Sequence, residues 1–341
     1  MITIKQIAVL AKVSPTTVSN VIHGRTDEMT PETLQRVQRV IKENDYVSNM
    51  SGRSLAKYGS KIIAVVKIEK NRKGDSMTHD PFFAEIIGTI EREVRTRGYF
   101  MMLYVSADVD ECLHMVKAWN VEGMIICGCG ADGCTQFVRS SEVPVVFIDG
   151  YFHNDGLPYA NIGADDFHGG YVMTEYLIQQ GHKRIAFLAD FQKLQGEYAA
   201  RRAGYKKALK KHGIPFLPED YIYINNDYQK RHKDYRNSTG GKLYGYTALF
   251  FASDFLAADY VNLLSDDGIH IPGDISVCGF DDNLYAVQTR PRLTTIHQDV
   301  PLKAFHAVEQ ILRMIRREPV AEYRIILPVS LVIRDSVKKL N

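Results

Sequence analysis

Residues 4–24 of the chain read IKQIAVLAKVSPTTVSNVIHG and predict two short helices joined by a tight turn. Thr3 can cap the first helix, since a threonine side chain accepts a hydrogen bond from the first turn. Ser14 can cap the second helix, and Pro15 suits its first position, where no N–H donor is needed. Gly24 would end that helix. This layout is typical of a helix-turn-helix.

The second helix carries short polar side chains at its N-terminal end. In a helix-turn-helix this end enters the major groove, where hydroxyls and amides contact phosphates and base edges. A third helix should begin at Thr30-Pro31 by the same cap-then-proline pattern. Residues 1–46 thus predict a DNA-binding headpiece, although a solvated capped helix would carry similar side chains. The groups concerned are Pro15, Thr16, Thr17, Ser19 and Asn20.

The charge distribution favours an anionic partner at this end of the chain. Residues 1–60 hold eight Lys/Arg and five Asp/Glu, a net charge of +3. The other 281 residues hold 34 Lys/Arg and 35 Asp/Glu, a net charge of −1. A small basic unit joined to a large neutral one is consistent with nucleic-acid binding by the basic unit.

Length and composition indicate a globular protein of two or three domains. The chain has 341 residues, of which 24% are charged and 45% hydrophobic. No apolar run approaches the roughly 20 residues that a membrane helix needs, and no secretory signal is visible. Five cysteines, an odd number, are too few for a disulfide scaffold. We therefore expect a reducing, cytoplasmic compartment.

From residue 61 onward, apolar runs of strand length alternate with segments of helical period. This alternation predicts an α/β fold with parallel sheets flanked by helices, as one barrel or two open-sheet lobes. Residues 47–60 are polar and indicate a linker, and Tyr228–Tyr246 is the least regular later segment. The expected strands are Ile62–Ile68, Phe100–Val105, Gly123–Cys127, Val145–Ile148, Ile185–Ala189, Ala248–Ala252 and Ile275–Gly279. The expected helices are Phe82–Arg97, Asp108–Trp119, Asp166–Gln180, Tyr198–His212, Asp254–Asp267 and Val300–Arg317.

The chain resembles the lactose-repressor/galactose-repressor family of transcriptional regulators. Residues 3–57 follow the family's headpiece in TIKQIA, VSPTTVSNVIHGR and RSLA, almost position by position. Further matches run in family order as DPFFAEIIGTIE, VEGMII, VPVVFID, GGYVMTEYLIQQGHKRIAFL, RRAGYKKAL, IPGDISVCGFDD and PRLTTIHQD. The resemblance implies a DNA-binding regulator, with repression as the expected activity, that acts as a homodimer on a pseudo-palindromic operator.

The resemblance also implies a domain plan. A helix-turn-helix headpiece in residues 1–46 and a hinge helix in 47–60 would precede an effector-binding and dimerisation domain in 61–341. That domain should have two lobes like those of periplasmic sugar-binding proteins, with the ligand between them. The N-lobe would comprise about residues 61–160 and 291–321, and the C-lobe about residues 161–290 and 322–341.

Site residues are implied in the same way, position by position. The cleft would combine carboxylates, an arginine and aromatic faces, a set that suits a sugar-like ligand with vicinal hydroxyls. Leu55 matches the leucine that wedges into the minor groove. The implied DNA contacts are Thr3, Ser14, Pro15, Thr16, Thr17, Ser19, Asn20, His23, Thr30, Asn49 and Leu55. The implied effector contacts are Phe82, Phe83, Asp149, Arg201, Tyr228, Ser253, Asp254 and Asp281.

The chain departs from the family at positions that decide specificity. Asn20 stands where the family usually has arginine, and Pro15 where it often has a bulkier residue. Asparagine favours adenine where arginine favours guanine, so the operator should differ from the family's commonest one. Ser48 replaces a proline at the start of the hinge helix. Ser253 replaces the asparagine of many sugar-binding members, so the ligand should differ as well.

A dinucleotide site is the main competing interpretation. Gly128, Gly130 and Gly133 form a literal G-x-G-x-x-G after a strand, and Asp149 ends the next strand. That fingerprint should follow the first strand of its unit, however, and here it follows the third. We therefore favour a glycine-rich connection between a strand and a helix. Tight binding of NAD would favour the dehydrogenase hypothesis. A protein that only binds solutes is a further alternative, but it would not need the headpiece.

No pattern in the sequence indicates catalysis or a bound metal. Cys127, Cys129 and Cys134 lack the second ligand pair that structural zinc needs, so buried thiols are the preferred interpretation. Neither a nucleophile elbow nor a phosphate-binding loop occurs. We expect a protein without enzymatic activity, cofactor or metal, whose partners are DNA, a small molecule and a second copy of itself.

Overall fold

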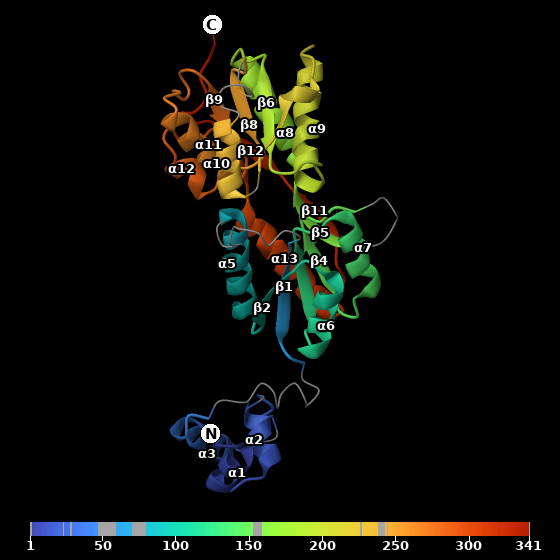
Figure 1. Cartoon of the computed structure of the whole chain (residues 1–341). Helices are drawn as coiled ribbons and strands as arrows, with labels where there is room; N and C mark the ends of the chain where they lie inside the picture. The colour runs from blue at the N-terminus through green and yellow to red at the C-terminus, as the bar shows by residue number, and fades with distance from the viewer. Residues whose placement is uncertain are drawn as a thin grey trace. The chain divides into compact units, whose positions relative to one another are not determined.

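The structure is a computed structural model that describes residues 2–22, 24–27, 29–46, 59–69, 80–152, 159–225, 227–237, 243 and 245–340. Its contacts divide the chain into two units, residues 1–60 and 61–341. Figure 1 labels the helices and strands of each unit.

The described part of the first unit folds into α1 (Ile4–Ala11), α2 (Pro15–Ile22) and α3 (Pro31–Glu43). Thr3 and Gln6 form a capping box on α1, and Thr30 caps α3. These helices and their capping pattern confirm the sequence prediction. The apolar faces meet in a small core of Ile7, Ala8, Ala11, Val18 and Val37. The hinge helix was expected in residues 47–60, of which residues 47–58 lie outside the described residues.

The N-lobe of the second unit is built on a parallel sheet with the strand order β11-β5-β4-β3-β1-β2. Helices α5 and α13 cover one face of this sheet, and α6 and α7 cover the other (Figure 1). The strands are β1 (Ile62–Ile68), β2 (Phe100–Ser106), β3 (Gly123–Cys127), β4 (Val145–Ile148), β5 (Ala160–Ala164) and β11 (Arg324–Leu327). The helices are α5 (Pro81–Thr96), α6 (Val109–Ala118), α7 (Ala131–Ser140) and α13 (Val300–Ile315).

The C-lobe has a second parallel sheet, with the strand order β7-β6-β8-β9. Helices α8 and α9 pack on one face, and α10, α11 and α12 on the other (Figure 1). The antiparallel pair β10 (Thr295–Gln298) and β12 (Val329–Val332) packs on the α8 side. The remaining elements are α8 (Asp166–Gln179), β6 (Ile185–Ala189), α9 (Gly196–Lys211), the 3₁₀ turn η2 (Pro218–Asp220), β7 (Tyr221–Tyr223), α10 (Tyr228–Asn237), β8 (Ala248–Phe251), α11 (Asp254–Asp266), β9 (Ser276–Cys278) and α12 (Leu284–Gln288).

The predicted α/β class and the parallel sheets are confirmed, but the predicted lobe boundaries are wrong by several residues. Strands β5 and β11 pair with each other and extend the N-lobe sheet, so residues 160–164 and 324–327 belong to the N-lobe. Strand β10 pairs with β12, and His297 bridges to Asp281 of the C-lobe. The pairing of these strands decides the lobe to which each segment belongs. A short strand such as ANIGA has too few large apolar residues for the sequence to predict it.

None of the helices expected from the sequence corresponds to α7, α10 or α12. The segment expected to be least regular, Tyr228–Tyr246, begins with the helix α10. This helix is strongly charged, so its apolar periodicity is weak, and its buried face contains Arg231 and Tyr235. Helix α7 begins at Ala131, so Gly133, the third glycine of the G-x-G-x-x-G motif, lies within it.

Candidate functional site

The N-terminal end of α2 presents the side chains that the sequence assigned to DNA. Ser14, Pro15 and Thr16 are exposed, whereas Thr17 and Asn20 are half-buried. The Ser14 hydroxyl accepts a hydrogen bond from the Thr17 backbone N–H at 3.0 Å and pairs with the Thr17 hydroxyl at 2.9 Å. This bond fixes the start of α2, whose exposed end offers hydroxyls and backbone N–H groups to a phosphate.

The other assigned DNA contacts are more dispersed over the headpiece. Ser19 is half-buried on α2. Thr3 accepts a hydrogen bond from the Gln6 backbone N–H, and Thr30 accepts one from the Thr33 backbone N–H, each at 3.3 Å. These two hydroxyls therefore also stabilise the starts of α1 and α3. His23, Asn49 and Leu55 lie outside the described residues.

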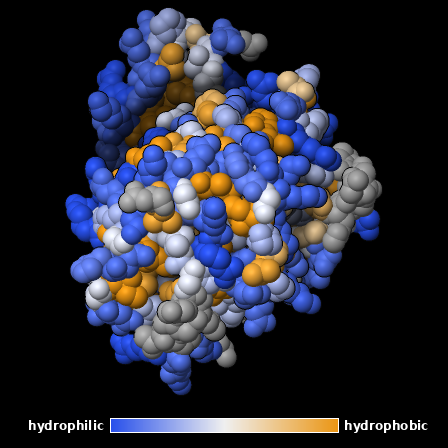
Figure 2. Space-filling model, turned by 90° about the horizontal axis from the view of Figure 1, so that it is seen from above, coloured by the Kyte–Doolittle hydropathy of each residue, from blue (hydrophilic) through white to orange (hydrophobic). Residues whose placement is uncertain are grey.

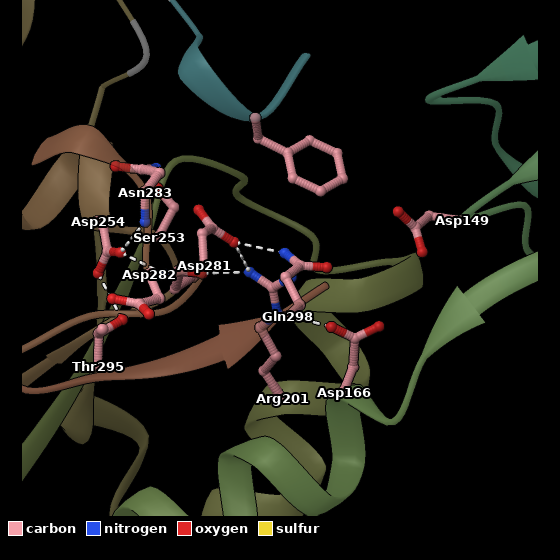
Figure 3. Close-up of polar contacts among 12 residues, drawn as sticks. Asp149, Asp166, Arg201, Ser253, Asp254, Asp281, Asp282, Asn283, Thr295 and Gln298 are labelled. Atoms are coloured by element: carbon pink, nitrogen blue, oxygen red, sulfur yellow. Dashed lines mark hydrogen bonds and ion pairs between the residues drawn. The ribbon is translucent and has the colours of Figure 1, made fainter. Parts of the chain in front are cut away.

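Arg201 on α9 lies at the centre of the polar cluster in the effector unit (Figure 3). Its Nε donates to Asp166 Oδ1 at 2.9 Å, and its Nη1 lies 3.6 Å from Asp281 Oδ1. The side chain is buried, with 4% of the residue exposed. Burial opposes the charged form, but Asp166 and Asp281 outweigh it and raise the pKa of Arg201.

Two glycines explain how α9 brings Arg201 to the start of α8. A Cβ on Gly170 of α8 would lie 2.0 Å from the backbone oxygen of Arg201. A Cβ on Gly204 of α9 would lie 2.0 Å from the backbone oxygen of Phe167. Only glycine allows the two backbones to approach this closely. The approach places Arg201 beside Asp166, the first residue of α8.

Asp281 follows β9 and joins the same cluster. Its Oδ1 accepts a hydrogen bond from Gln298 Nε2 at 2.7 Å and faces Arg201. Burial raises the pKa of Asp281 to about 7, and the negative charge of Asp80 adds to this, while Arg201 and Gln298 oppose it. The sequence prediction that Arg201 and Asp281 lie together agrees with this geometry.

Lys303 on α13 completes the cluster from the N-lobe and was missed by the sequence analysis. The side chain is fully buried. Its Nζ donates to both carboxylate oxygens of Asp149 and to Gln298 Oε1, each at 2.8 Å. Gln298 in turn donates to Asp281, so side chains of the two lobes form one connected network. The signal available in the sequence was a lysine on the otherwise apolar face of a helix.

Asp254 and Ser253, which were expected as direct effector contacts, already have hydrogen-bond partners within the protein. Asp254 is fully buried, and its carboxylate accepts hydrogen bonds from the Asp282 N–H at 2.7 Å and the Asn283 N–H at 3.2 Å. It also accepts one from Thr295 Oγ1 at 2.7 Å (Figure 3). Ser253 caps α11. Asp254 thus holds the loop that carries Asp281.

Phe82 and Phe83 begin α5, where the carboxylate of Asp80 caps the helix. Phe83 is buried, and Phe82 is half-buried. The ammonium of Lys303 lies 5.1 Å from the Phe82 ring centre, and that of Lys67 lies 4.8 Å from the Phe83 ring centre. The rings therefore already pack against the cations of the cluster, at distances typical of cation–π contacts.

Tyr228 was expected to form an aromatic wall of the effector cleft. It is 50% exposed at the start of α10 and lines a hollow of about 730 Å³ between α10, α11 and α12. Phe255, Asn262 and Tyr285 line the same hollow, and Arg201 does not. The structure thus places Tyr228 on a concave surface that Arg201 does not line, and its role as an effector contact stays a prediction.

The glycine motif connects β3 to α7 and shows no sign of a phosphate site. A Cβ on Gly128 would lie 2.8 Å from Lys67 Nζ, so the lysine fills the space beside this turn. Gly130 caps α7, and Gly133 lies inside the helix. The carboxylate of Asp149, which a dinucleotide would need for its ribose, is bonded to Lys303.

The described residues contain no group of histidine, cysteine, aspartate and glutamate side chains that could hold a metal ion. Cys134 Sγ donates to the backbone oxygen of Cys129 at 3.3 Å, and both residues are buried. None of the helices that the structure describes is long and apolar enough to cross a membrane. On the face seen in Figure 2, hydrophobic residues form separate patches among hydrophilic ones.

Three family models match the chain. One, described as periplasmic binding proteins and sugar binding domain of the LacI family, matches residues 60–234. The bacterial regulatory proteins of the lacI family match residues 3–49, and a periplasmic binding protein-like domain matches residues 174–337. The chain belongs to the LacI family. It is a DNA-binding transcriptional regulator, with a helix-turn-helix headpiece and a periplasmic-binding-protein-like effector domain.

Two relatives and two solved structures match this LacI-family chain over nearly its whole length. The transcriptional repressor PurR of Histophilus somni is 29% identical, with 100% of both chains covered. The regulator CelR of Thermobifida fusca is 27% identical, with 98% of both covered. The structure of a CelR–cellobiose complex matches with a TM-score of 0.71 and 26% identity over 98% of this chain and 100% of that one. A lac repressor dimer bound to operator shares the fold, with a TM-score of 0.83 and 24% identity over 99% of both chains.

Proposed function

We propose that this LacI-family regulator is a homodimeric repressor whose affinity for a pseudo-palindromic operator is set by a sugar-like effector held between the lobes. The observation that carries the proposal is the network Asp149–Lys303–Gln298–Asp281–Arg201, in which buried charged groups of both lobes converge. A ligand that bonds to both ends of this network would favour one relative orientation of the lobes. Such a two-state change can be transmitted to the DNA-binding unit.

DNA binding is proposed to depend on the N-terminal end of α2. Two headpieces related by a twofold axis would place two α2 helices in successive major grooves. The test is selection of a binding site from random DNA, followed by fluorescence anisotropy on the selected site. Removing residues 1–60 should abolish binding while the effector unit stays folded, because the chain divides at this point. Equal binding by the truncated protein would contradict the role of the headpiece.

A sugar is the proposed effector class, and CelR, solved with cellobiose, is one relative that supports it. The test is a thermal-shift screen of sugars, nucleosides and their phosphates. A ligand at about 100 times its Kd should stabilise the protein by roughly 2.7 kcal/mol. The same compound should then change operator affinity, in either direction. We propose binding without chemical conversion, so turnover of the bound compound would contradict this part.

A homodimer is proposed because both lobes expose apolar side chains at their edges. Phe100 and Leu103 are 56% and 39% exposed on β2, the edge strand of the N-lobe sheet. Leu284 and Val287 are 58% and 41% exposed on α12 of the C-lobe. Exposed apolar groups on an edge strand favour association with another chain. Analytical ultracentrifugation in a reducing buffer, as in the cytoplasm, should show a dimer. A monomer at working concentrations would contradict the proposed homodimer.

A further inference from the structure

Carboxylates gather around a single guanidinium where the two lobes meet. Arg201 interacts electrostatically with carboxylates from both lobes, and these lie in separate elements of the fold. Asp190, directly after β6, joins this group through its interaction with Asp80. The carboxylates are Asp80 and Asp149 from the N-lobe, and Asp166, Asp190, Glu197 and Asp281 from the C-lobe.

Carboxylates of opposite lobes repel each other in this cluster. Burial raises the pKa of Asp190 to about 6, and the negative charge of Asp80 adds to the shift. Asp281 is raised to about 7, also first by burial, with Asp80 contributing from the other lobe. Burial likewise raises the pKa of Glu197 to about 7. Burial is the largest cause of all three shifts, and the negative charge of Asp80 adds to those of Asp190 and Asp281.

Two cations of the cluster already have carboxylate partners, and a third, Lys67, packs on the Phe83 ring and acts electrostatically on Asp80. Arg201 is paired with Asp166 and Asp281, and Lys303 bonds both carboxylate oxygens of Asp149. Arg231 also lowers the pKa of Asp190, but its guanidinium donates to Asp259 and to the backbone oxygen of Asn225. None of these contacts satisfies the side chain of Asp190.

Asp190 carries the observation that points to a ligand. Its Oδ1 is buried and accepts no hydrogen bond from any residue in the described part of the chain. It follows the carboxyl end of β6, the edge at which open parallel sheets bind ligands. Tyr198 is half-buried on α9, with the Arg201 guanidinium 5.3 Å from its ring centre, and Asp190, Asp281 and Glu197 all act electrostatically on its hydroxyl. A neutral aromatic ring among carboxylates is the surrounding that an organic ammonium ion prefers.

We propose that the effector carries a protonated amine, which Asp190 receives as an ion pair against the ring of Tyr198. The inference rests on the proposed function, because it names the chemistry of the same interlobe site. The ammonium places a positive charge beside Asp190 and gives its Oδ1 the hydrogen-bond donor that the described residues do not supply. It also screens Asp80 of the N-lobe from the carboxylates of the C-lobe. Closure of the lobes around the amine therefore costs less than closure around a neutral sugar.

The test compares D-glucosamine, N-acetyl-D-glucosamine, D-glucose and putrescine by thermal shift and calorimetry at about pH 7 on the full chain. D-Glucosamine, putrescine or both should bind at least about tenfold more tightly than the two uncharged sugars, because one charge-assisted contact is gained. The amine that binds more tightly shows whether the effector is an amino sugar or a plain diamine. Tighter binding of either uncharged sugar, or no binding of both amines at about 10 mM, would overturn the proposal.

Two variants tie the amine to Asp190. Asp190→Asn keeps the shape of the side chain and should reduce amine affinity about tenfold or more, with little effect on an uncharged sugar. Glu142→Gln is the control, since the Glu142 side chain is 72% exposed and pairs with Lys117. Without ligand, Asp190→Asn should raise the Tm at about pH 8 and much less at about pH 5, where the native carboxyl holds a proton. If Asp190→Asn lowered the Tm at both pH values, the inference that Asp190 carries an unpaired charge would be contradicted.

The outcomes separate this inference from the proposed function. If an uncharged sugar binds tightly and changes operator affinity, the proposed function stands and the amine is wrong. If an amine binds at Asp190 but operator affinity does not respond, the site is correct and the regulatory role is wrong. Anisotropy with the selected operator, with and without each of the four compounds, distinguishes these cases.

Discussion

Lys303 Nζ lies 2.8 Å from each carboxylate oxygen of Asp149, and the lysine is fully buried. A third acceptor, Gln298 Oε1, lies at the same distance, so every proton of the ammonium has a partner. A buried charge is tolerated only when it is paired and hydrogen-bonded in this way. The contact ties α13 to the end of β4 within the N-lobe, and Gln298 extends it to Asp281 of the C-lobe.

Lys303→Met should therefore destabilise the protein strongly. The substitution leaves the Asp149 carboxylate buried without its cation, a loss of about 3–5 kcal/mol for a broken buried pair. Urea unfolding of the effector unit measures it. Lys207→Met, at an exposed position of α9, is the control and should cost less than about 0.5 kcal/mol. Adding Asp149→Asn to Lys303→Met should recover part of the loss, and no recovery would mean that packing dominates.

Arg201→Ala should shift the response to the effector to at least about tenfold higher ligand concentrations while leaving operator binding without ligand intact. Losing a charge-assisted hydrogen bond costs about 1.5–3 kcal/mol, or tenfold or more in Kd. The neighbouring Arg202→Ala is the matched control, because Arg202 packs on the Tyr221 ring at 5.0 Å. Calorimetry with the compound identified by the screen measures both variants. Equal affinity for wild type and Arg201→Ala would place the effector elsewhere.

Asp281 should make the stability of the protein depend on pH. Its pKa is raised to about 7 by burial and by Asp80, while Arg201, Gln298 and Lys303 lower it. A carboxyl whose folded pKa lies above its unfolded value, near 3.8, binds its proton more tightly in the folded state. Its contribution to the unfolding free energy is greatest below about pH 4 and falls as the pH rises through about 7.

The measurement is Tm against pH for wild type and Asp281→Asn. The variant should gain stability relative to wild type at about pH 8 and lose that advantage at about pH 4, where the native carboxyl is protonated. Asp335→Asn is the control, since Asp335 is half-exposed and pairs with Arg292 at the surface. A difference that does not change with pH would mean that Asp281 titrates as an exposed carboxyl.

The sequence predicted elements where hydrophobic periodicity was strong. The buried runs of β1, β3 and β6, and the capped starts of α2 and α3, were visible as patterns of apolar residues and of serine, threonine and proline. Helix α10 was missed, because it buries Arg231 beside Tyr235 and exposes charges elsewhere. Local patterns fail where a helix is stabilised by an ion pair rather than an apolar stripe.

The candidate site was only partly predictable, for a related reason. Arg201 and Asp281 could be assigned from family motifs, and the structure brings them together. Lys303 and Asp190 carry no local motif, and their importance depends on neighbours distant in the sequence. Asp254 fits its motif, but the backbone N–H groups that occupy its carboxylate become apparent only in three dimensions.

Asn20→Arg should change the preferred operator at one base pair in each half-site. Asn20 is half-buried on α2, one turn beyond the exposed Pro15 and Thr16, so it remains within reach of a base edge. Arginine pairs best with guanine and asparagine with adenine, and a bidentate contact is worth about 1–3 kcal/mol of discrimination. Thr16→Ser, which keeps a hydroxyl at the exposed end, is the control and should leave the preference unchanged. Site selection from random DNA compares the three proteins, and an identical preferred site for Asn20→Arg would remove the base-reading role of this residue.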